Sequence, residues 1–144
     1  MTIHISKELN SKDKQSIKDE LYYFNLKHFP EDLRGKYEEI CLFLKEDDGT
    51  VRGGLLSEVC WNWLEIHVLI VDEELRKAGY GTQLMLEIEK IAREKQCDFI
   101  KVDTLSFQAL AFYKKHGYKV YGTLDNVGRD YEHYYLKKDL TTRL

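Results

Sequence analysis

The chain has 144 residues, of which 43% are hydrophobic and 33% are charged, so it has the composition of one folded domain and not of a disordered segment. A net charge of −3 and a pI of about 6.0 exclude the broad basic surface that nucleic-acid binding requires. No apolar run is long enough to span a membrane, and the N-terminus lacks a secretory pattern. Three widely spaced cysteines, Cys41, Cys60 and Cys97, indicate reduced thiols, so we expect a cytoplasmic protein without a membrane partner.

The first half of the chain predicts a short strand, a helix and an antiparallel meander. Alternating Ile3 and Ile5 predict a strand over 2–6, and apolar residues at helical spacing predict a helix over 11–25. Three apolar stretches then predict the meander strands, at 37–45, 51–60 and 63–71. Asp-Gly at 48–49 favours a hairpin turn after the first strand. Gly53–Gly54 inside the second strand predicts a bulge or the close approach of another group.

The second half predicts two helices and three further strands. Leu84, Ile88, Ile91 and Ala92 share one face of a helix expected over 81–95. A shorter helix is expected over 108–116, ended by Gly117. The remaining strands are expected at 99–104, 118–124 and 133–138, with a polar turn at 125–130.

The order of these elements predicts the class of the fold. A helix connects the strand at 63–71 to the strand at 99–104, so these two strands should be parallel, in a right-handed crossover. The other neighbouring strands should be antiparallel. The sequence therefore predicts one mixed α+β domain, mostly antiparallel, with a parallel junction in the middle of its sheet.

The loop between the strand ending at Val71 and the helix over 81–95 has the spacing Arg76-x-x-Gly79-x-Gly81. The first turn of a helix has unpaired N–H groups and a partial positive charge, which suit a phosphate. Glycine permits close backbone approach, and Arg76 and Lys77 add positive charge. The loop has neither the Gly-Lys-Ser/Thr of a Walker A loop nor the third glycine of a Rossmann fingerprint. It predicts a pyrophosphate-binding loop, with a simple tight turn as the alternative.

Two motifs resemble those of the GNAT (GCN5-related N-acetyltransferase) superfamily. The Arg76-x-x-Gly79-x-Gly81 loop resembles motif A, and residues 109–118, Ala-Leu-Ala-Phe-Tyr-Lys-Lys-His-Gly-Tyr, resemble motif B. The resemblance is strongest over 64–120. It implies a GNAT-like three-layer fold, with helices on both faces of a mostly antiparallel sheet and a V-shaped junction of two parallel strands. It also implies acetyl-CoA as co-substrate and no metal.

The resemblance implies a set of residues that bind acetyl-CoA. The family binds the pantetheine arm against strand backbone, which corresponds here to Leu69, Ile70 and Val71. The pyrophosphate corresponds to the loop residues Arg76, Lys77, Ala78, Gly79, Tyr80, Gly81 and Thr82. Ser106 stands where many members have an Asn, so Ser106 or Gln108 is expected either to bind CoA or to cap the following helix.

The resemblance also implies catalytic residues. Tyr113 falls on the motif-B tyrosine, which implies a proton donor to the leaving thiolate and a contact with the cofactor; packing on the apolar helix face is the alternative. Glu65 is a candidate base for the amine, with Glu58 and His67 nearby. Simple alternation places Glu65 and His67 on one face of their strand.

Alternation also fixes the neighbours of Glu65: Trp63 and Leu69 share its face, and the opposite face has Leu64, Ile66, Val68 and Ile70. The five histidines form no His-x-x-x-His pair and have no close carboxylate cluster, so we expect no metal site.

The sequence therefore predicts an N-acetyltransferase that transfers an acetyl group from acetyl-CoA to a primary amine of a small molecule or peptide by direct attack. One alternative is a non-catalytic acyl-CoA-binding regulatory module. Another is a toxin-like member of the family that acts on aminoacyl-tRNA, which the net negative charge disfavours. Family members often dimerise, so a homodimer is one expected state, and no nucleic-acid partner is expected.

Overall fold

The structure, a computed structural model, describes residues 1–140, and the chain divides into two units, Met1–Arg34 and Gly35–Leu144. The first unit contains the helix α1 (Ser11–Leu26) and the 3-10 turn η1 (Glu31–Leu33). Asn10 caps α1 by accepting a hydrogen bond from the N–H of Asp13 at 3.1 Å. Residues 1–10 are irregular, so the strand predicted over 2–6 is wrong: two alternating isoleucines are insufficient without a partner strand.

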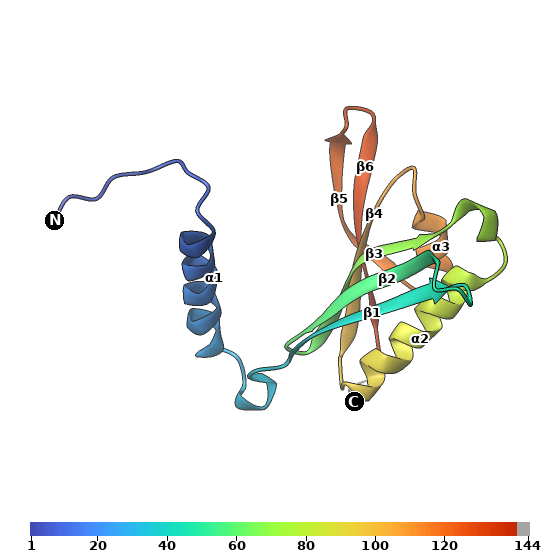
Figure 1. Cartoon of the computed structure of the whole chain (residues 1–144), viewed down its shortest axis with the longest axis horizontal. Helices are drawn as coiled ribbons and strands as arrows, with labels where there is room; N and C mark the ends of the chain where they lie inside the picture. The colour runs from blue at the N-terminus through green and yellow to red at the C-terminus, as the bar shows by residue number, and fades with distance from the viewer. Residues whose placement is uncertain (141–144) are drawn as a thin grey trace. The chain divides into compact units, whose positions relative to one another are not determined.

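The second unit is a six-stranded sheet with the strand order β1-β2-β3-β4-β6-β5 (Figure 1). Its strands are β1 (Tyr37–Lys45), β2 (Val51–Cys60), β3 (Trp63–Val71), β4 (Phe99–Leu105), β5 (Lys119–Val127) and β6 (Tyr131–Asp139). β3 and β4 are parallel, and the other pairs are antiparallel. The predicted mixed sheet and its parallel junction are therefore confirmed.

The turn between β5 and β6 is shorter than the polar stretch predicted at 125–130. β5 continues to Val127, and β6 begins at Tyr131. Gly128 and Arg129 have φ of 58° and 77°, which lets the chain reverse within a few residues. Asp125 and Asn126 therefore belong to β5, and only residues 128–130 form the turn.

Two helices pack beside this sheet. The 3-10 turn η2 (Glu73–Leu75) precedes α2 (Tyr80–Glu94), which joins β3 to β4 and lies along one face of the sheet (Figure 1). The short helix α3 (Leu110–Lys115) follows β4. The apolar stripe predicted on α2 is buried or partly buried, and Met85 and Glu89 are buried beside it. No helix within residues 1–140 is both long enough and apolar enough to cross a membrane.

The glycine pair in β2 permits unusually close strand packing. A Cβ at Gly53 would lie 2.6 Å from the carbonyl oxygen of Ile70, and a Cβ at Gly54 would lie 2.5 Å from that of Leu42. Either contact would force neighbouring backbone to move. The predicted close approach is therefore confirmed, and the approaching groups are the backbones of the adjacent strands.

A β-bulge changes the face on which β3 presents its side chains. Val68 pairs with Leu56 of β2 but Ile66 pairs with Ser57, so His67 is an extra residue on β3. Beyond it, Leu69 and Val71 pack on the core, whereas Val68 and Ile70 are 43% and 58% exposed.

The simple alternation predicted for β3 is therefore wrong beyond Ile66. One inserted residue reverses the facing of every residue that follows it. Glu65 consequently shares its face with Val68 and Ile70, and not with Leu69.

Candidate active site

β3 and β4 stop pairing in the middle of the sheet, and we call the place where their register ends the opening. The parallel pairing begins with Trp63 opposite Phe99 and ends with Ile66 opposite Val102. Beyond that point β3 pairs with β2, and β4 pairs with β6. The bulge at His67 directly follows the last parallel pair, so the two strands lose their common register there.

The backbone of β3 directs only some of its polar groups toward this opening. The N–H of Asp72 donates to the carbonyl of Arg52 at 2.8 Å, which makes these two residues a hydrogen-bonded pair. Hydrogen-bonded and non-hydrogen-bonded pairs alternate in an antiparallel ladder, so Ile70 also bonds to β2. Leu69 and Val71 then present their N–H and C=O groups to the opposite side, toward the opening.

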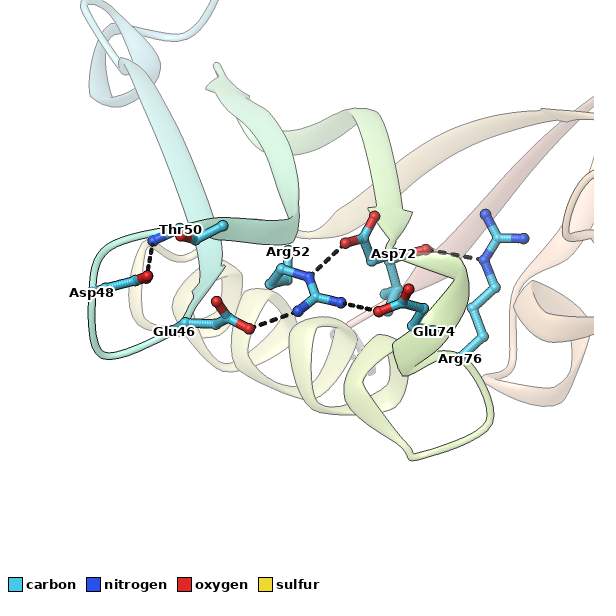
Figure 2. A network of polar contacts seen from close by, with 8 residues as sticks. Glu46, Asp48, Thr50, Arg52, Asp72, Glu74 and Arg76 are labelled. Atoms are coloured by element: carbon cyan, nitrogen blue, oxygen red, sulfur yellow. Dashed lines mark hydrogen bonds and ion pairs between the residues drawn. The ribbon is translucent and has the colours of Figure 1, made fainter.

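A contact of Arg76 agrees with this assignment. Its Nε donates to the carbonyl oxygen of Val71 at 3.0 Å (Figure 2). Of the three residues predicted to hold the pantetheine arm, Leu69 and Val71 therefore have suitably directed backbone, and Ile70 does not. Their role in binding stays a prediction.

The loop that leaves β3 has the geometry of a phosphate site. Lys77 and Gly79 have φ of 66° and 86°, and Gly79 is the N-cap of α2. A Cβ at Gly79 would meet nothing within 4 Å, so its backbone is accessible. The following residues, Tyr80, Gly81 and Thr82, supply the unpaired N–H groups of the first helical turn. With Arg76 and Lys77 beside them, these groups fit a pyrophosphate.

Gly81 has a packing role in addition to the one predicted. A Cβ there would lie 3.3 Å from two ring atoms of Phe112 on α3. One residue further, Oγ1 of Thr82 is 3.2 Å from Nε2 of His116. The first turn of α2 is thus packed against the helix that contains Tyr113.

Arg52 on β2 holds the segment between β3 and the loop at 76–82 in place. No sequence motif had identified Arg52. Its guanidinium donates to Asp72 and Glu46 at 2.6 Å each, and to Glu74 at 2.9 Å (Figure 2). Hydrogen bonds from Arg52 to Asp72 and Glu46 raise its already high pKa. Glu46 lies on the β1–β2 hairpin, whereas Asp72 and Glu74 lie just after β3 and in η2, more than 25 residues further along the chain. Only the fold could bring them together.

Tyr113 is buried in the core, with 4% of its surface exposed. Its ring packs against those of Phe112 and Tyr118, with centroids 5.4 Å and 5.9 Å away. Burial, and then the charge of Asp103, raise the pKa of Tyr113 to about 12. The phenol is therefore neutral at physiological pH and able to donate a hydrogen bond.

The raised pKa also limits what this phenol can do. A thiol has an ordinary pKa below the raised pKa of Tyr113, so complete proton transfer from this phenol to a thiolate would be uphill. A hydrogen bond to a thiolate does not carry that cost. The environment of Tyr113 therefore favours hydrogen-bond donation over full proton transfer, and its catalytic role stays a prediction.

Glu58 on β2 is the centre of a polar cluster that faces away from α2. It accepts hydrogen bonds from the hydroxyl of Tyr37 at 2.6 Å and from the thiol of Cys60 at 3.5 Å, and Nε2 of His67 lies 3.2 Å away. Burial would raise the pKa of Glu58, but the hydrogen bonds from Tyr37, His67 and Cys60 outweigh it, so the pKa is lowered. Glu58 is thus a well-held anion and a weak base.

Glu65 lies beside this cluster. It pairs with Glu58 across the β2–β3 ladder, and side-chain ligand atoms of Glu58, Glu65 and His67 lie within 4.8 Å of one another. The expectation that no carboxylate cluster accompanies a histidine is therefore wrong, because strand register brought the three together. Such a cluster of acids also suits a cationic amine.

Ser106 and Gln108 serve the turn after β4. The N–H of Ser106 donates to the carbonyl of Glu132, and its hydroxyl accepts from the N–H of Glu132 at 3.1 Å. Oε1 of Gln108 accepts from the N–H of Leu105 at 2.7 Å. The N-cap of α3 is Ala109, without a side-chain hydrogen bond, so the alternative that Ser106 or Gln108 caps this helix is wrong.

The parallel pairing that ends at Ile66 and Val102, with the glycine-containing loop after β3 and the helix of Tyr113 after β4, is the arrangement that the sequence predicted for an acetyltransferase. Residues 7–118 match the acetyltransferase (GNAT) family, and the chain belongs to that family.

Individual relatives agree with this assignment. An acetyltransferase from Agrobacterium fabrum is 28% identical over 124 residues, which cover 86% of this chain and 88% of that protein. The blasticidin-S acetyltransferase of Streptomyces morookaense is 36% identical over 93 residues, covering 64% and 68%. The crystal structure of an acetyltransferase from Bacillus cereus ATCC 14579 has a TM-score of 0.88 and 36% identity, covering 96% of this chain and 98% of that one.

Proposed function

We propose that this protein is an acetyl-CoA-dependent N-acetyltransferase that transfers the acetyl group to a primary amine of a small molecule or peptide by direct attack. One observation carries the proposal. The two strands whose pairing ends at Ile66 and Val102 are followed in the chain by the proposed phosphate loop and by the helix of the proposed hydrogen-bond donor. β3 leads into the loop at 76–82, and β4 leads into the helix of Tyr113.

Each part of the chain then has a defined task. Arg76 to Thr82 hold the pyrophosphate of acetyl-CoA, and the backbones of Leu69 and Val71 pair with its pantetheine arm. Acetyl-CoA supplies the activated acyl group. Tyr113 donates a hydrogen bond to the sulfur as negative charge develops there. Glu65, with Glu58 and His67 beside it, holds the amine on the face of the sheet opposite α2.

The acceptor that fits best is a cationic small-molecule amine. Glu58 and Glu65 provide adjacent negative charges on the face from which the amine would approach. The 36% identity to an enzyme named for an antibiotic acceptor, blasticidin S, supports a small molecule over a peptide.

A panel of amines incubated with acetyl-CoA and followed by thiol release tests the proposal. We expect release of free CoA with at least one small cationic amine. In parallel, calorimetry should show that Arg76→Ala weakens CoA binding by about 1.5–3 kcal/mol if its charged contact with phosphate is formed. The matched control is Lys90→Ala on the exposed face of α2, which should leave CoA binding unchanged.

The outcomes separate the alternatives. CoA binding without thiol release, whatever the amine, would identify a non-catalytic acyl-CoA-binding module. Thiol release only with aminoacyl-tRNA would identify the toxin-like activity. Unchanged CoA affinity in Arg76→Ala would contradict the assignment of the phosphate loop.

A further inference from the structure

Asp103, His133 and Tyr135 form a connected array on the face of the sheet opposite α2. Nε2 of His133 lies 3.3 Å from Oδ2 of Asp103, and the hydroxyl of Tyr135 lies 3.2 Å from Nδ1 of the same imidazole. The rings of His133 and Tyr135 are tilted together with centroids 4.5 Å apart. The three groups are thus connected in the order hydroxyl, imidazole, carboxylate. In enzymes this order lets a histidine activate the hydroxyl while the acid orients the other nitrogen of the imidazole.

The array is located at the opening between β3 and β4. Val102 makes the last parallel pair with β3, and Asp103 is the next residue on β4. Asp103 pairs with Tyr135 on β6, and Leu105 pairs with His133. Val102, Thr104 and Leu136 are buried on the α2 side, so strand alternation places Asp103, His133 and Tyr135 on the other side, with Glu65.

Solvent reaches this array. The side chain of Asp103 is 50% exposed and that of His133 is 25% exposed. Asp103 also lies near enough to Tyr113 for its charge to help raise the pKa of that phenol. The array is therefore close to the proposed thiolate-binding tyrosine.

The Glu58 cluster on the other side of the opening is a poorer proton acceptor. Three hydrogen-bond donors hold Glu58 and lower its pKa. Glu65 pairs with Lys101 inside the closed part of the junction, short of the point where the strands separate. Imidazole is also the side chain whose ordinary pKa lies nearest neutrality, so a proton passes to it from an ammonium at lower cost than to a carboxylate.

We propose that His133 is the general base for the acceptor amine, reached through the hydroxyl of Tyr135, with Asp103 as a positioning residue; this rests on the proposed function. The ammonium gives one proton to Oη of Tyr135 while Tyr135 gives its own proton to Nδ1 of His133. The resulting imidazolium is stabilised by Asp103 and later releases that proton to solvent.

The freed nitrogen lone pair forms the N–C bond at the acetyl carbon, and the C–S bond breaks with its electron pair going to sulfur. The nitrogen loses its second proton to solvent on becoming an amide. The thiolate, which accepts a hydrogen bond from Tyr113, takes a proton from solvent. No oxidant or metal is needed.

Kinetics of conservative variants test the assignment. With the best amine of the panel, His133→Gln and Tyr135→Phe should each lower kcat at pH 7 at least about tenfold, with the KM for acetyl-CoA unchanged. Asp103→Asn should lower kcat by a smaller factor. The deficit of His133→Gln should shrink at alkaline pH, where the amine is already neutral. Among the described residues, Asp103 from β4 and Tyr135 on β6 are ionisable groups in contact with His133, and Tyr121 from β5 has its ring 6.4 Å from that of Tyr135.

A matched control lies on the same face of the sheet. Asp139→Asn makes the same chemical change as Asp103→Asn at the other end of the β4–β6 pairing, and it should keep kcat within about threefold of the parent protein. His67→Gln removes the imidazole beside Glu58 and so tests the other side of the opening. Loss in His67→Gln with full turnover in His133→Gln would place the base there and overturn the proposal.

The hydrogen position on His133 can be measured in the free protein, without any acceptor amine or turnover. ¹⁵N NMR of the imidazoles should show His133 with its hydrogen on Nε2, and Tyr135→Phe should shift the Nδ1 resonance. A hydrogen on Nδ1 would overturn the relay even if no acceptor amine were found. If the amine panel alone failed, the proposed function would be at fault.

Discussion

At the scale of single residues, Tyr113 has the environment of a neutral hydrogen-bond donor. Tyr113→Phe keeps the ring that packs against Phe112 and Tyr118 but removes the hydroxyl. We expect turnover to fall at least about tenfold while the KM for acetyl-CoA changes little, because the phosphate loop is untouched. Steady-state kinetics on the folded variant measures both constants. Near-normal turnover would mean that Tyr113 only fills the core.

Gly81 and Gly79 give a second test at this scale, because the same methyl group meets different surroundings. A Cβ at Gly81 presses on Phe112 at 3.3 Å, whereas a Cβ at Gly79 has free space but a φ of 86°. We expect Gly81→Ala to lower kcat through displacement of Tyr113, and Gly79→Ala to weaken CoA binding through the altered loop. Calorimetry with CoA beside steady-state kinetics separates the two effects. If both variants changed kcat and CoA affinity in the same way, the separate roles of Gly81 in packing and Gly79 in the loop would be contradicted.

At the scale of elements, Arg52 ties the β1–β2 hairpin to the end of β3 and to η2. Arg52→Met keeps the length of the side chain but leaves Glu46, Asp72 and Glu74 without their shared cation. We expect faster amide hydrogen exchange across 72–79 and weaker CoA binding, with exchange in β4 and β6 unchanged. Lys45→Met, on the same hairpin, is the control. Unaltered exchange at 72–79 would show that the turn holds its shape unaided.

At the scale of the whole domain, a buried ion pair joins α2 to β6. Nζ of Lys138 lies 2.7 Å and 3.1 Å from the two oxygens of Glu89, whose side chain is 3% exposed. Lys138→Met should lower the free energy of unfolding by about 3 kcal/mol, because a buried carboxylate loses its partner.

The double variant isolates the cause of that loss. Glu89→Leu combined with Lys138→Met removes both charges, and we expect stability near that of the parent protein. Denaturant unfolding measures both variants. If the double variant were as unstable as Lys138→Met, the attraction between Glu89 and Lys138 would exceed the free-energy cost of burying the two charges.

The stability of the domain should fall at alkaline pH. Burial raises the pKa of Tyr113 from 10.0 to about 12 and that of Cys97 from 9.0 to about 11. A group whose pKa is higher in the folded state stabilises it fully below the ordinary pKa and loses that contribution as pH rises through the folded value. The free energy of unfolding should therefore decline from about pH 9 to pH 12. Denaturant unfolding across this range checks it, and the decline should be smaller in Tyr113→Phe.

Local patterns in the sequence predicted most of the helices and strands, and two motifs indicated the family. Apolar periodicity is a local property, so β1, β2 and β3 were predicted at their observed limits, and α2 within one residue. The loop at 76–82 could be proposed as a phosphate site from the sequence because its glycines, its arginine and the start of its helix are contiguous, and that role stays a prediction. The prediction of a strand over 2–6 was wrong because two alternating isoleucines do not form a strand without a partner strand.

Which residues face the opening depends on contacts between parts of the chain that are distant in sequence. The bulge at His67 depends on the register between β2 and β3, and it reversed the facing of Leu69 and Ile70. Arg52 joins carboxylates from three elements, and Asp103, His133 and Tyr135 come from two strands that are distant in the chain. Such contacts depend on which strands pair and in what register, and no local pattern of residues encodes them.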